Sequence, residues 1–139
     1  MAKGIMIIDG QRVPFDGEKN VLAVIRKAGI EIPTFCYYSE LSTYGACRMC
    51  MVEDTKTGKL DASCSMEPRD GMSIRTNTAR LLKHRRMILE LLLSSHDCEC
   101  TTCPKSGNCQ LQKLAQQFGV RHIRFEDTRP RRERDYTSP

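Results

Sequence analysis

The stretch "YGACRMCMVE", Tyr44–Glu53, places two cysteines two residues apart, and Gly45 and Ala46 stand directly before the first of them. Small residues at such positions let a loop wrap closely and turn its backbone amides toward sulfur. Two isolated cysteines flank the pair, so the group has the pattern C-x10-C-x2-C-x13-C. The four members of this first group are Cys36, Cys47, Cys50 and Cys64. Cysteines at short fixed spacing in a chain without export features favour a metal site over disulfides.

The spacing of the first group distinguishes between two kinds of metal site. Zinc ribbons carry two C-x2-C pairs about 15 to 20 residues apart, whereas this group holds one such pair. A 2Fe–2S site of the plant type uses C-x4-C-x2-C and a distant fourth cysteine. The first group has that shape with a longer first gap, so it favours a 2Fe–2S cluster. A zinc knuckle, or a ferredoxin-like fold that has lost its metal, is the alternative.

The residues around the first group predict an α+β fold of the β-grasp type. Residues 5–15, "IMIIDGQRVPF", predict a hairpin about Asp9-Gly10. Residues 20–29 predict a short helix that begins after Asn20 and stops at Gly29. A second hairpin about Thr57-Gly58 and a strand within 71–77 follow. Two hairpins and one crossing helix form such a layered fold.

A second group of ligands lies within "SSHDCECTTCPKSGNC", residues 94–109, in the pattern H-x3-C-x2-C-x5-C. Its members are His96, Cys100, Cys103 and Cys109. Three thiolates and one imidazole could bind zinc tetrahedrally or hold a 4Fe–4S cluster, and local chemistry leaves both open. Cys98 lies between His96 and Cys100; it could replace the histidine or remain a spare thiol.

Helices are expected on both sides of the second group. In residues 79–95, Leu81, Ile88 and Leu92 share one helical face, flanked by Leu82, Leu89 and Leu93. This helix would deliver His96, and a second helix within 109–119 would stop at Gly119. A neutral histidine in place of a negative thiolate would raise the reduction potential of a cluster.

Composition and motifs exclude several classes of function. The 139 residues carry a formal net charge of +5, which falls to about +2 when two anionic clusters are counted. No apolar run approaches the roughly 18 residues of a membrane helix, and no signal-peptide features occur, so a cytoplasmic protein without membrane insertion is expected. No G-x-G-x-x-G, P-loop or H-E-x-x-H motif occurs, so no catalytic residue is assigned and enzymatic activity is left undecided.

Basic residues cluster at 84–86 and at 129–134. No aromatic pattern for base stacking accompanies them, so nucleic-acid binding is not expected. The basic tail instead suits docking on a partner subunit. His84 and His122 are isolated and are interpreted as solvated or packed residues.

With both groups in view, the sequence resembles a known family. "EIPTFCYYSELSTYGACRMCMVE" and "CTTCPKSGNCQLQKLAQQFGVRHIRFE" are similar to the N-terminal iron–sulfur region of the large iron–sulfur subunit of complex I. The same region occurs in the catalytic subunit of NAD-dependent, electron-bifurcating iron–iron hydrogenases, which these stretches resemble most, and in NAD-linked formate dehydrogenases. The resemblance covers nearly the whole chain.

The resemblance implies the ligands and the domains. It assigns Cys36, Cys47, Cys50 and Cys64 to a 2Fe–2S cluster, and His96, Cys100, Cys103 and Cys109 to a 4Fe–4S cluster, with no role for Cys98. The expected organisation begins with a β-grasp 2Fe–2S ferredoxin-like domain at 1–78. A small helical 4Fe–4S domain with one histidine and three cysteine ligands follows at 79–119, and a basic tail or linker occupies 120–139.

The resemblance also implies a function. The chain would be an electron-transfer subunit or domain of a hetero-oligomeric NAD(P)-linked oxidoreductase, most similar to an electron-bifurcating hydrogenase. Its partners would be a flavin/NAD(H)-binding subunit and further iron–sulfur or catalytic subunits. NAD-linked formate dehydrogenase and complex I are alternatives within this class. Alternatives of other classes are a zinc-stabilised binding module for nucleic acid or protein, and a redox sensor with a labile cluster.

Overall fold

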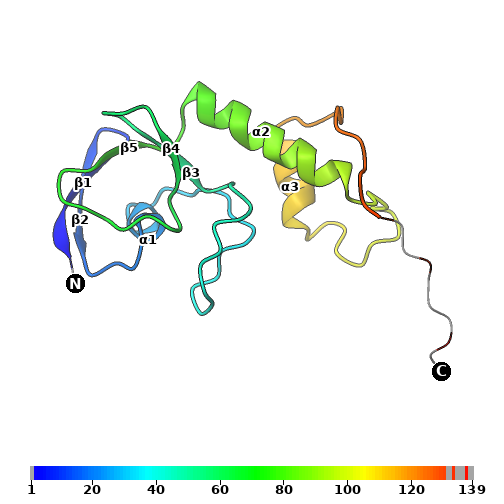
Figure 1. Ribbon diagram of the computed structural model, residues 1–139, viewed down its shortest axis with the longest axis horizontal. Coiled ribbons are helices and arrows are strands. Elements are labelled where there is room, and N and C mark those ends of the chain that lie inside the picture. The colour runs from blue at the N-terminus through cyan, green and yellow to red at the C-terminus, as the bar shows by residue number, and fades with distance from the viewer. Residues whose placement is uncertain (1, 131–132, 134–136, 138–139) are drawn as a thin grey trace. The chain divides into compact units, whose positions relative to one another are not determined.

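The computed structural model describes residues 2–130, 133 and 137, and the chain forms two compact units, Met1–Ile88 and Leu89–Pro139. The first unit is built on a five-stranded sheet in the order β2-β1-β5-β3-β4 (Figure 1). The strands are β1 (Lys3–Ile8), β2 (Gln11–Asp16), β3 (Met51–Asp54), β4 (Leu60–Ala62) and β5 (Ser73–Arg75).

The predicted first hairpin is confirmed. Strands β1 and β2 pair antiparallel, with Ile8 opposite Gln11 at the turn. Asp9 has φ 51° and Gly10 has φ 84°, and a two-residue turn of this kind needs positive φ at both central positions. Asp9 and Gly10 tolerate that conformation better than most residues, so the local sequence determines this turn.

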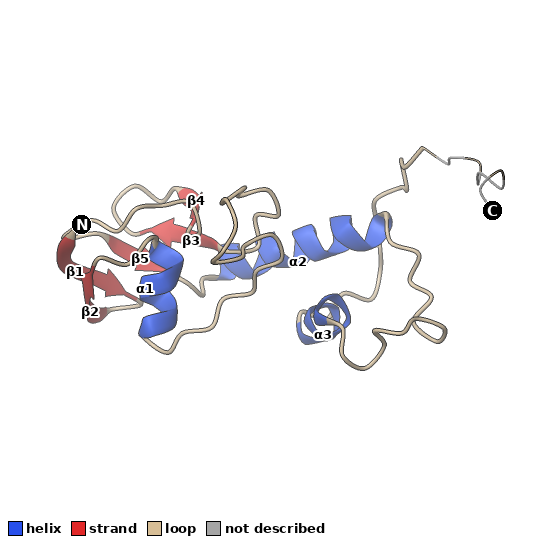
Figure 2. Ribbon diagram, turned by 90° about the horizontal axis from the view of Figure 1, so that it is seen from below, coloured by secondary structure: helices blue, strands red, loops and turns tan. Residues whose placement is uncertain are grey.

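The predicted helix is also confirmed, as α1 (Val21–Lys27). The Asn20 side chain accepts a hydrogen bond of 2.9 Å from the Ala23 amide and caps the helix. Figure 2 shows α1 lying across one side of the sheet. Its apolar residues belong to the same buried cluster as residues of β1, β2, β3 and β5. The buried residues of α1 are Val21, Leu22, Val24 and Ile25.

The last three strands complete the predicted α+β, β-grasp architecture. Strands β3 and β4 form the second hairpin, and β5 lies in the centre of the sheet. There β5 pairs parallel with β1 and antiparallel with β3. The sheet is therefore mixed, and its central strand comes from a segment near the end of the first unit.

Helix α2 (Ala79–Ser94) begins in the first unit and ends in the second, and α3 (Gln110–Gln117) lies in the second. The apolar face predicted for the first of these helices is partly wrong. Leu81 is buried, but Leu92 is 38% exposed. The buried face of the helix instead includes Leu81, Arg85 and Leu89. These positions are four residues apart, so they fall on one face of the helix. Arg85 interrupts the hydrophobic pattern, which is why the sequence predicted a different face.

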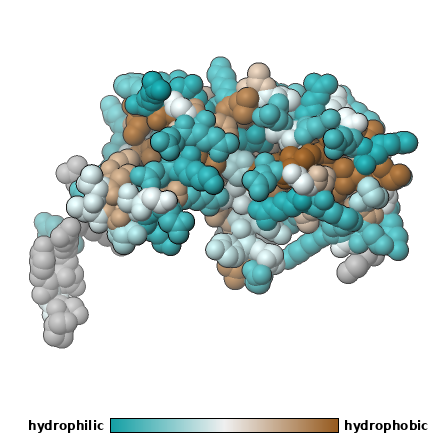
Figure 3. All heavy atoms as spheres, turned by 180° about the vertical axis from the view of Figure 1, so that it is seen from behind, coloured by the Kyte–Doolittle hydropathy of each residue, from teal (hydrophilic) through white to brown (hydrophobic). Residues whose placement is uncertain are grey.

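On the face drawn in Figure 3, hydrophilic side chains alternate with separate apolar patches. Across the described residues, no helix combines the length and the apolar character needed to cross a bilayer. In the predicted basic tail, Arg129 is paired with Asp127 (2.8 Å) and Asp97 (3.1 Å). The other three arginines of the basic run 129–134, Arg131, Arg132 and Arg134, lie outside the described residues.

Candidate metal centres

The four cysteines of the first group lie together beside the sheet. Cys36 and Cys47 are half-buried in the loop between α1 and β3, whereas Cys50, directly before β3, and Cys64, just after β4, are each 1% exposed. None of the eight cysteines, all of which lie within the described residues, forms a disulfide. Burial and the negative charges of the other three cysteines raise the pKa of Cys64 to about 12. Such mutual influence indicates that the four sulfur atoms share one small region of the fold.

The end of the β3–β4 ladder fixes two of these cysteines. Met51 pairs with Ala62 in the ladder. One step further, the Cys50 carbonyl accepts hydrogen bonds from the Ser63 amide (3.2 Å) and the Ser63 hydroxyl (2.7 Å). Because Ser63 precedes Cys64, these bonds tie the backbones of the two cysteines to each other.

Helix α1 anchors the loop that carries Cys36. The Asn20 side chain donates a 3.1 Å hydrogen bond to the Tyr37 hydroxyl. Arg26 lies over the Tyr37 ring, 5.6 Å from its centroid, and donates to the Thr34 hydroxyl at 3.2 Å. The residues on both sides of Cys36 are therefore held by the helix that the sequence already predicted.

Backbone amides point toward sulfur in this loop. The Cys47 amide lies 3.5 Å from Cys36 Sγ and donates to it. Burial opposes ionisation of Cys47, but amide hydrogen bonds, chiefly from Met49, lower its pKa overall. Positive φ at Gly45 (62°) and Arg48 (57°) turns the chain on either side of Cys47. Amide donors around thiolates are a usual means of stabilising an anionic iron–sulfur cluster.

The donor set of the first group fits a 2Fe–2S cluster. A 2Fe–2S cluster spreads four thiolates over two irons, and the first group supplies four thiols with amide donors beside them. These residues therefore fit a 2Fe–2S cluster, which would supply one-electron chemistry.

The second group begins just beyond α2. The His96 amide donates to the Leu93 carbonyl (3.1 Å), so the last turn of α2 positions the histidine as the sequence predicted. The Cys98 amide lies 3.4 Å from His96 Nδ1 and donates to it. The Cys98 thiol donates to the Leu93 carbonyl at 3.9 Å, and Cys98 has φ 55°. The Cys98 sulfur is thus directed toward the end of α2.

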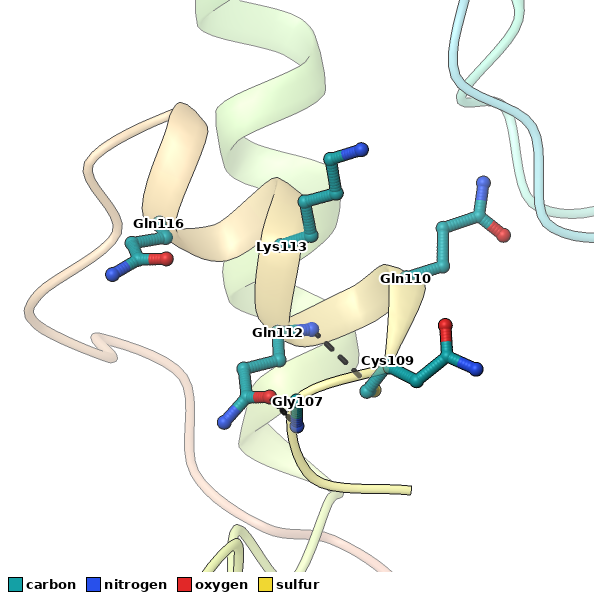
Figure 4. A pocket seen from close by; sticks show the side chains of 7 residues that line it. Gly107, Cys109, Gln110, Gln112, Lys113 and Gln116 are labelled. Atoms are coloured by element: carbon teal, nitrogen blue, oxygen red, sulfur yellow. Dashed lines mark hydrogen bonds between the residues drawn. The ribbon is translucent and has the colours of Figure 1, made fainter.

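Turns present the three remaining cysteines of this group. Cys100 and Cys103 are exposed and joined by a 3.4 Å hydrogen bond from the Cys103 amide to the Cys100 carbonyl. Cys109 is the N-cap of α3, and its sulfur accepts from the Gln112 amide at 3.5 Å (Figure 4). The Gln112 side chain returns to accept from the Gly107 amide at 3.0 Å. Gly107, Cys109 and Gln112 also line an open pocket of about 590 Å³, and most of its lining residues are polar.

The two groups therefore differ in geometry. The contacts described above link the first four cysteines, two of which are buried, whereas Cys100 and Cys103 are exposed; among the described residues neither group forms a site for a single metal ion. His96, Cys100, Cys103 and Cys109 lie in one segment between α2 and α3, and Cys109 is the N-cap of α3. Three thiols and an imidazole are a donor set that suits four irons.

Two residues that shape the first site were not predicted from the sequence. Ser63 donates hydrogen bonds to the Cys50 carbonyl, and the buried Arg85 side chain donates to the carbonyls on both sides of Cys50. Arg85 stands inside the basic run 84–86, which has the pattern of a solvated patch, so only its position on the buried face of α2 could have revealed it. In the same run, His84 contacts the Arg48 carbonyl at 3.2 Å, which fits the interpretation of a packed residue.

An ion pair between Glu90 and Arg124 joins two segments of the second unit, and we expect its loss to lower the thermal stability. Glu90 is 4% exposed, and both of its carboxylate oxygens accept from the Arg124 guanidinium at 2.8 Å. The Arg124 amide also donates to Glu90 at 2.7 Å. These bonds hold the pKa of Glu90 at about 2, below its ordinary value of 4.5. Glu90→Gln should therefore lower the midpoint of thermal unfolding at pH 7.

The pH dependence of this deficit follows from the sign of the shift. A carboxyl whose folded pKa is depressed stabilises the fold above its unfolded pKa and loses that effect as pH falls. The difference between wild type and Glu90→Gln should shrink between about pH 4.5 and pH 2. Glu126→Gln, at an exposed position, is the matched control. A deficit that is the same at pH 3 as at pH 7 would contradict the assignment.

Comparison with known proteins adds to this geometry. Residues 5–79 match the model of a 2Fe-2S iron-sulfur cluster binding domain, and residues 85–124 match the NADH-ubiquinone oxidoreductase-G iron-sulfur binding region. Because these models describe iron–sulfur binding, the zinc interpretation of both groups is set aside.

Two curated relatives are similar over most of this chain. The NADH-ubiquinone oxidoreductase 75 kDa subunit of Reclinomonas americana is 41% identical over 88% of the chain, which spans 18% of that protein. The mitochondrial NADH-ubiquinone oxidoreductase 78 kDa subunit of Candida albicans is 34% identical over 91% of the chain, which again spans 18% of that protein. The chain thus spans less than a fifth of the length of each.

A solved structure shows the same fold. A chain of an NAD+-reducing [NiFe]-hydrogenase in the H2-reduced state has a TM-score of 0.85 and 33% identity to this protein. The similarity covers 99% of this chain and 58% of that one. Together, the two matching regions, the relatives and the first group of thiols show that this chain belongs to the iron–sulfur family that includes the 75 kDa subunit of NADH-ubiquinone oxidoreductase, and that its cofactors are a 2Fe–2S and a 4Fe–4S cluster.

Proposed function

We propose that this chain relays electrons one at a time between a flavin/NAD(H)-binding subunit and further iron–sulfur centres of an NAD(P)-linked oxidoreductase. The observation that carries the proposal is the presence of two iron–sulfur regions on one chain, the first with four thiols gathered beside the sheet. In such a relay the protein positions the clusters, shields them and adjusts their potentials.

The proposed ligands follow the sequence assignment. Cys36, Cys47, Cys50 and Cys64 would hold the 2Fe–2S cluster, and His96, Cys100, Cys103 and Cys109 would hold the 4Fe–4S cluster. Burial of Cys50 and Cys64 and the amide donors near Cys36 and Cys47 support the first set. The helix ends beside His96 and Cys109 support the second set.

The parent complex is a finer hypothesis. We place it among NAD-linked hydrogenases, with the electron-bifurcating kind as the specific candidate, and the similarity to a chain of an NAD+-reducing hydrogenase supports the broader group. Complex I, supported by the relatives named above, and NAD-linked formate dehydrogenase are the alternatives. In each case the chain would act in a cytoplasmic hetero-oligomer, and the basic tail would be a docking segment. Anaerobic isolation with native partners, followed by attempted cluster reduction with H2, formate or NADH, distinguishes these complexes, because reduction by H2 indicates a hydrogenase, reduction by formate indicates a formate dehydrogenase, and reduction by NADH alone indicates complex I.

The cluster content is the first prediction to test. Anaerobically purified protein should contain about six irons per chain and show two distinct EPR signals after reduction with dithionite. Iron and acid-labile sulfide analysis with EPR makes this measurement. Zinc at about one or two equivalents per chain with no EPR signal would refute the proposed electron-transfer function.

A further inference from the structure

Arg85 is a buried cation next to the first cysteine group. Its side chain lies on the buried face of α2, and the residue is 3% exposed. Its Nε donates to the Met49 carbonyl at 3.3 Å, and its Nη2 donates to the carbonyls of Met51 (3.0 Å) and Thr76 (2.8 Å). Met49 and Met51 are the neighbours of Cys50, so one guanidinium binds the backbone on both sides of a proposed ligand.

This cation needs a counter-charge. Removing a charge from water is costly unless an opposite charge lies close. Each hydrogen bond described for Arg85 goes to a neutral carbonyl, and no carboxylate within the described residues forms an ion pair with it. Asp9 acts on Arg85 electrostatically, but its two oxygens accept from the amide and the hydroxyl of Thr76.

Cys50 is one of the two negative groups, with Asp9, that act electrostatically on Arg85. Burial lowers the pKa of Arg85, and the charges of Cys50 and Asp9 oppose that shift. Four thiolates around two irons carry a formal net charge of about −2 when oxidised and about −3 when reduced by one electron. A fixed positive charge stabilises the more negative of these two states more strongly.

We propose that Arg85 is the internal counter-cation of the 2Fe–2S site, fixing the backbone around Cys50 and raising the reduction potential of the cluster. The proposal rests on the proposed function, because it takes Cys50 as a cluster ligand. Reduction adds one electron and no proton, and the donor is the NAD(H)-linked partner or, in the test, dithionite. Arg85 touches no reacting atom and acts through charge and position.

Three substitutions separate charge from position. Arg85→Lys keeps the charge but loses the planar fork of donors. Arg85→Gln loses the charge but keeps an amide donor, and Arg85→Met loses both. Lys83→Gln removes one positive charge from an exposed position of the same helix and serves as the control. Each full-length protein is prepared anaerobically, and its iron content, thermal unfolding and EPR-monitored redox titration are compared.

We expect a lower midpoint potential of the 2Fe–2S cluster in the two variants that lack the positive charge, Arg85→Gln and Arg85→Met. At the midpoint potential of the wild type, the ratio of reduced to oxidised 2Fe–2S cluster should fall about tenfold in Arg85→Gln and Arg85→Met, a change of about 59 mV for a one-electron couple. Arg85→Lys should change this ratio by less than about threefold, because it keeps the charge, and Lys83→Gln should leave it unchanged. Unfolding temperatures should fall in all three Arg85 variants, because each weakens the hydrogen bonds to backbone.

Several outcomes would overturn the role of Arg85. They are an unchanged potential in Arg85→Gln, or equal shifts in Arg85→Lys and Arg85→Met. If Arg85→Gln and Arg85→Met take up no cluster, retention of the cluster by Arg85→Lys supports the counter-charge role. Loss of the cluster from Arg85→Lys as well would refute that role. A wild-type protein without a 2Fe–2S signal would instead refute the proposed function, so the two failures are distinguishable.

Discussion

Replacing Cys50 by serine is expected to remove the 2Fe–2S EPR signal and to lower the iron content from about six to about four per chain. Cys50 is 1% exposed and is held by Ser63 and by the backbone contacts of Arg85. A serine hydroxyl at this buried position is a much weaker iron ligand than a thiolate. The 4Fe–4S signal should persist, because its proposed ligands lie in the other unit.

The buried position of Cys50 requires a second variant. A hydroxyl in the core could destabilise the unit by itself, so Cys47→Ser at a half-buried loop position repeats the test with less effect on packing. Cys98→Ser is the matched control, since Cys98 is exposed and its thiol contacts the Leu93 carbonyl. Circular dichroism verifies the fold of each variant. Retention of about six irons by both Cys50→Ser and Cys47→Ser would refute the ligand assignment.

Replacing His96 by cysteine is expected to retain the 4Fe–4S cluster and lower its midpoint potential by on the order of 100 mV. A thiolate adds one negative charge next to the irons, which disfavours reduction. In Rieske centres two histidines raise the potential by about 250 mV or more, which gives the sign and the scale. A redox titration followed by EPR measures the shift.

His122 provides the control for this substitution. It is exposed and lies in the same unit, so His122→Cys should leave the potential of the 4Fe–4S cluster unchanged. If His96→Cys and wild type titrate at the same potential, His96 is not a ligand. Adding Cys98→Ser to His96→Ala shows whether the neighbouring thiol can take the place of the histidine.

The sequence predicted those elements whose signals are local. The turn at Asp9-Gly10, the cap at Asn20 and the helix ends near Gly29 and Gly119 depend on residues that favour one backbone conformation at one place. The spacing of the first cysteine group is likewise a local signal, and the thiols do gather beside the sheet. The ligand assignments themselves stay predictions, as do the domain limits at residues 78 and 119.

The features that the sequence did not predict depend on contacts between distant segments. The central place of β5 comes from pairing with β1 and β3, which no short pattern specifies. Arg85 binds carbonyls 34 and 36 residues earlier in the chain. In sequence it stands between a histidine and another arginine, where a basic run is usually solvated. Its burial displaced the predicted apolar face of α2, because a charged residue was not counted among the core positions.

Arg85 also limits where the 2Fe–2S module can be separated from the sequence that follows it. The matched 2Fe–2S region ends at residue 79, but the compact first unit continues to Ile88 and includes the donor that binds Met49, Met51 and Thr76. A gene-fusion or recombination event that joined a ferredoxin-like module at residue 79 to an unrelated sequence would leave those carbonyls without their guanidinium. The heritable module therefore includes about three turns of the helix that follows it. Selection on the first module thus constrains the opening sequence of the second.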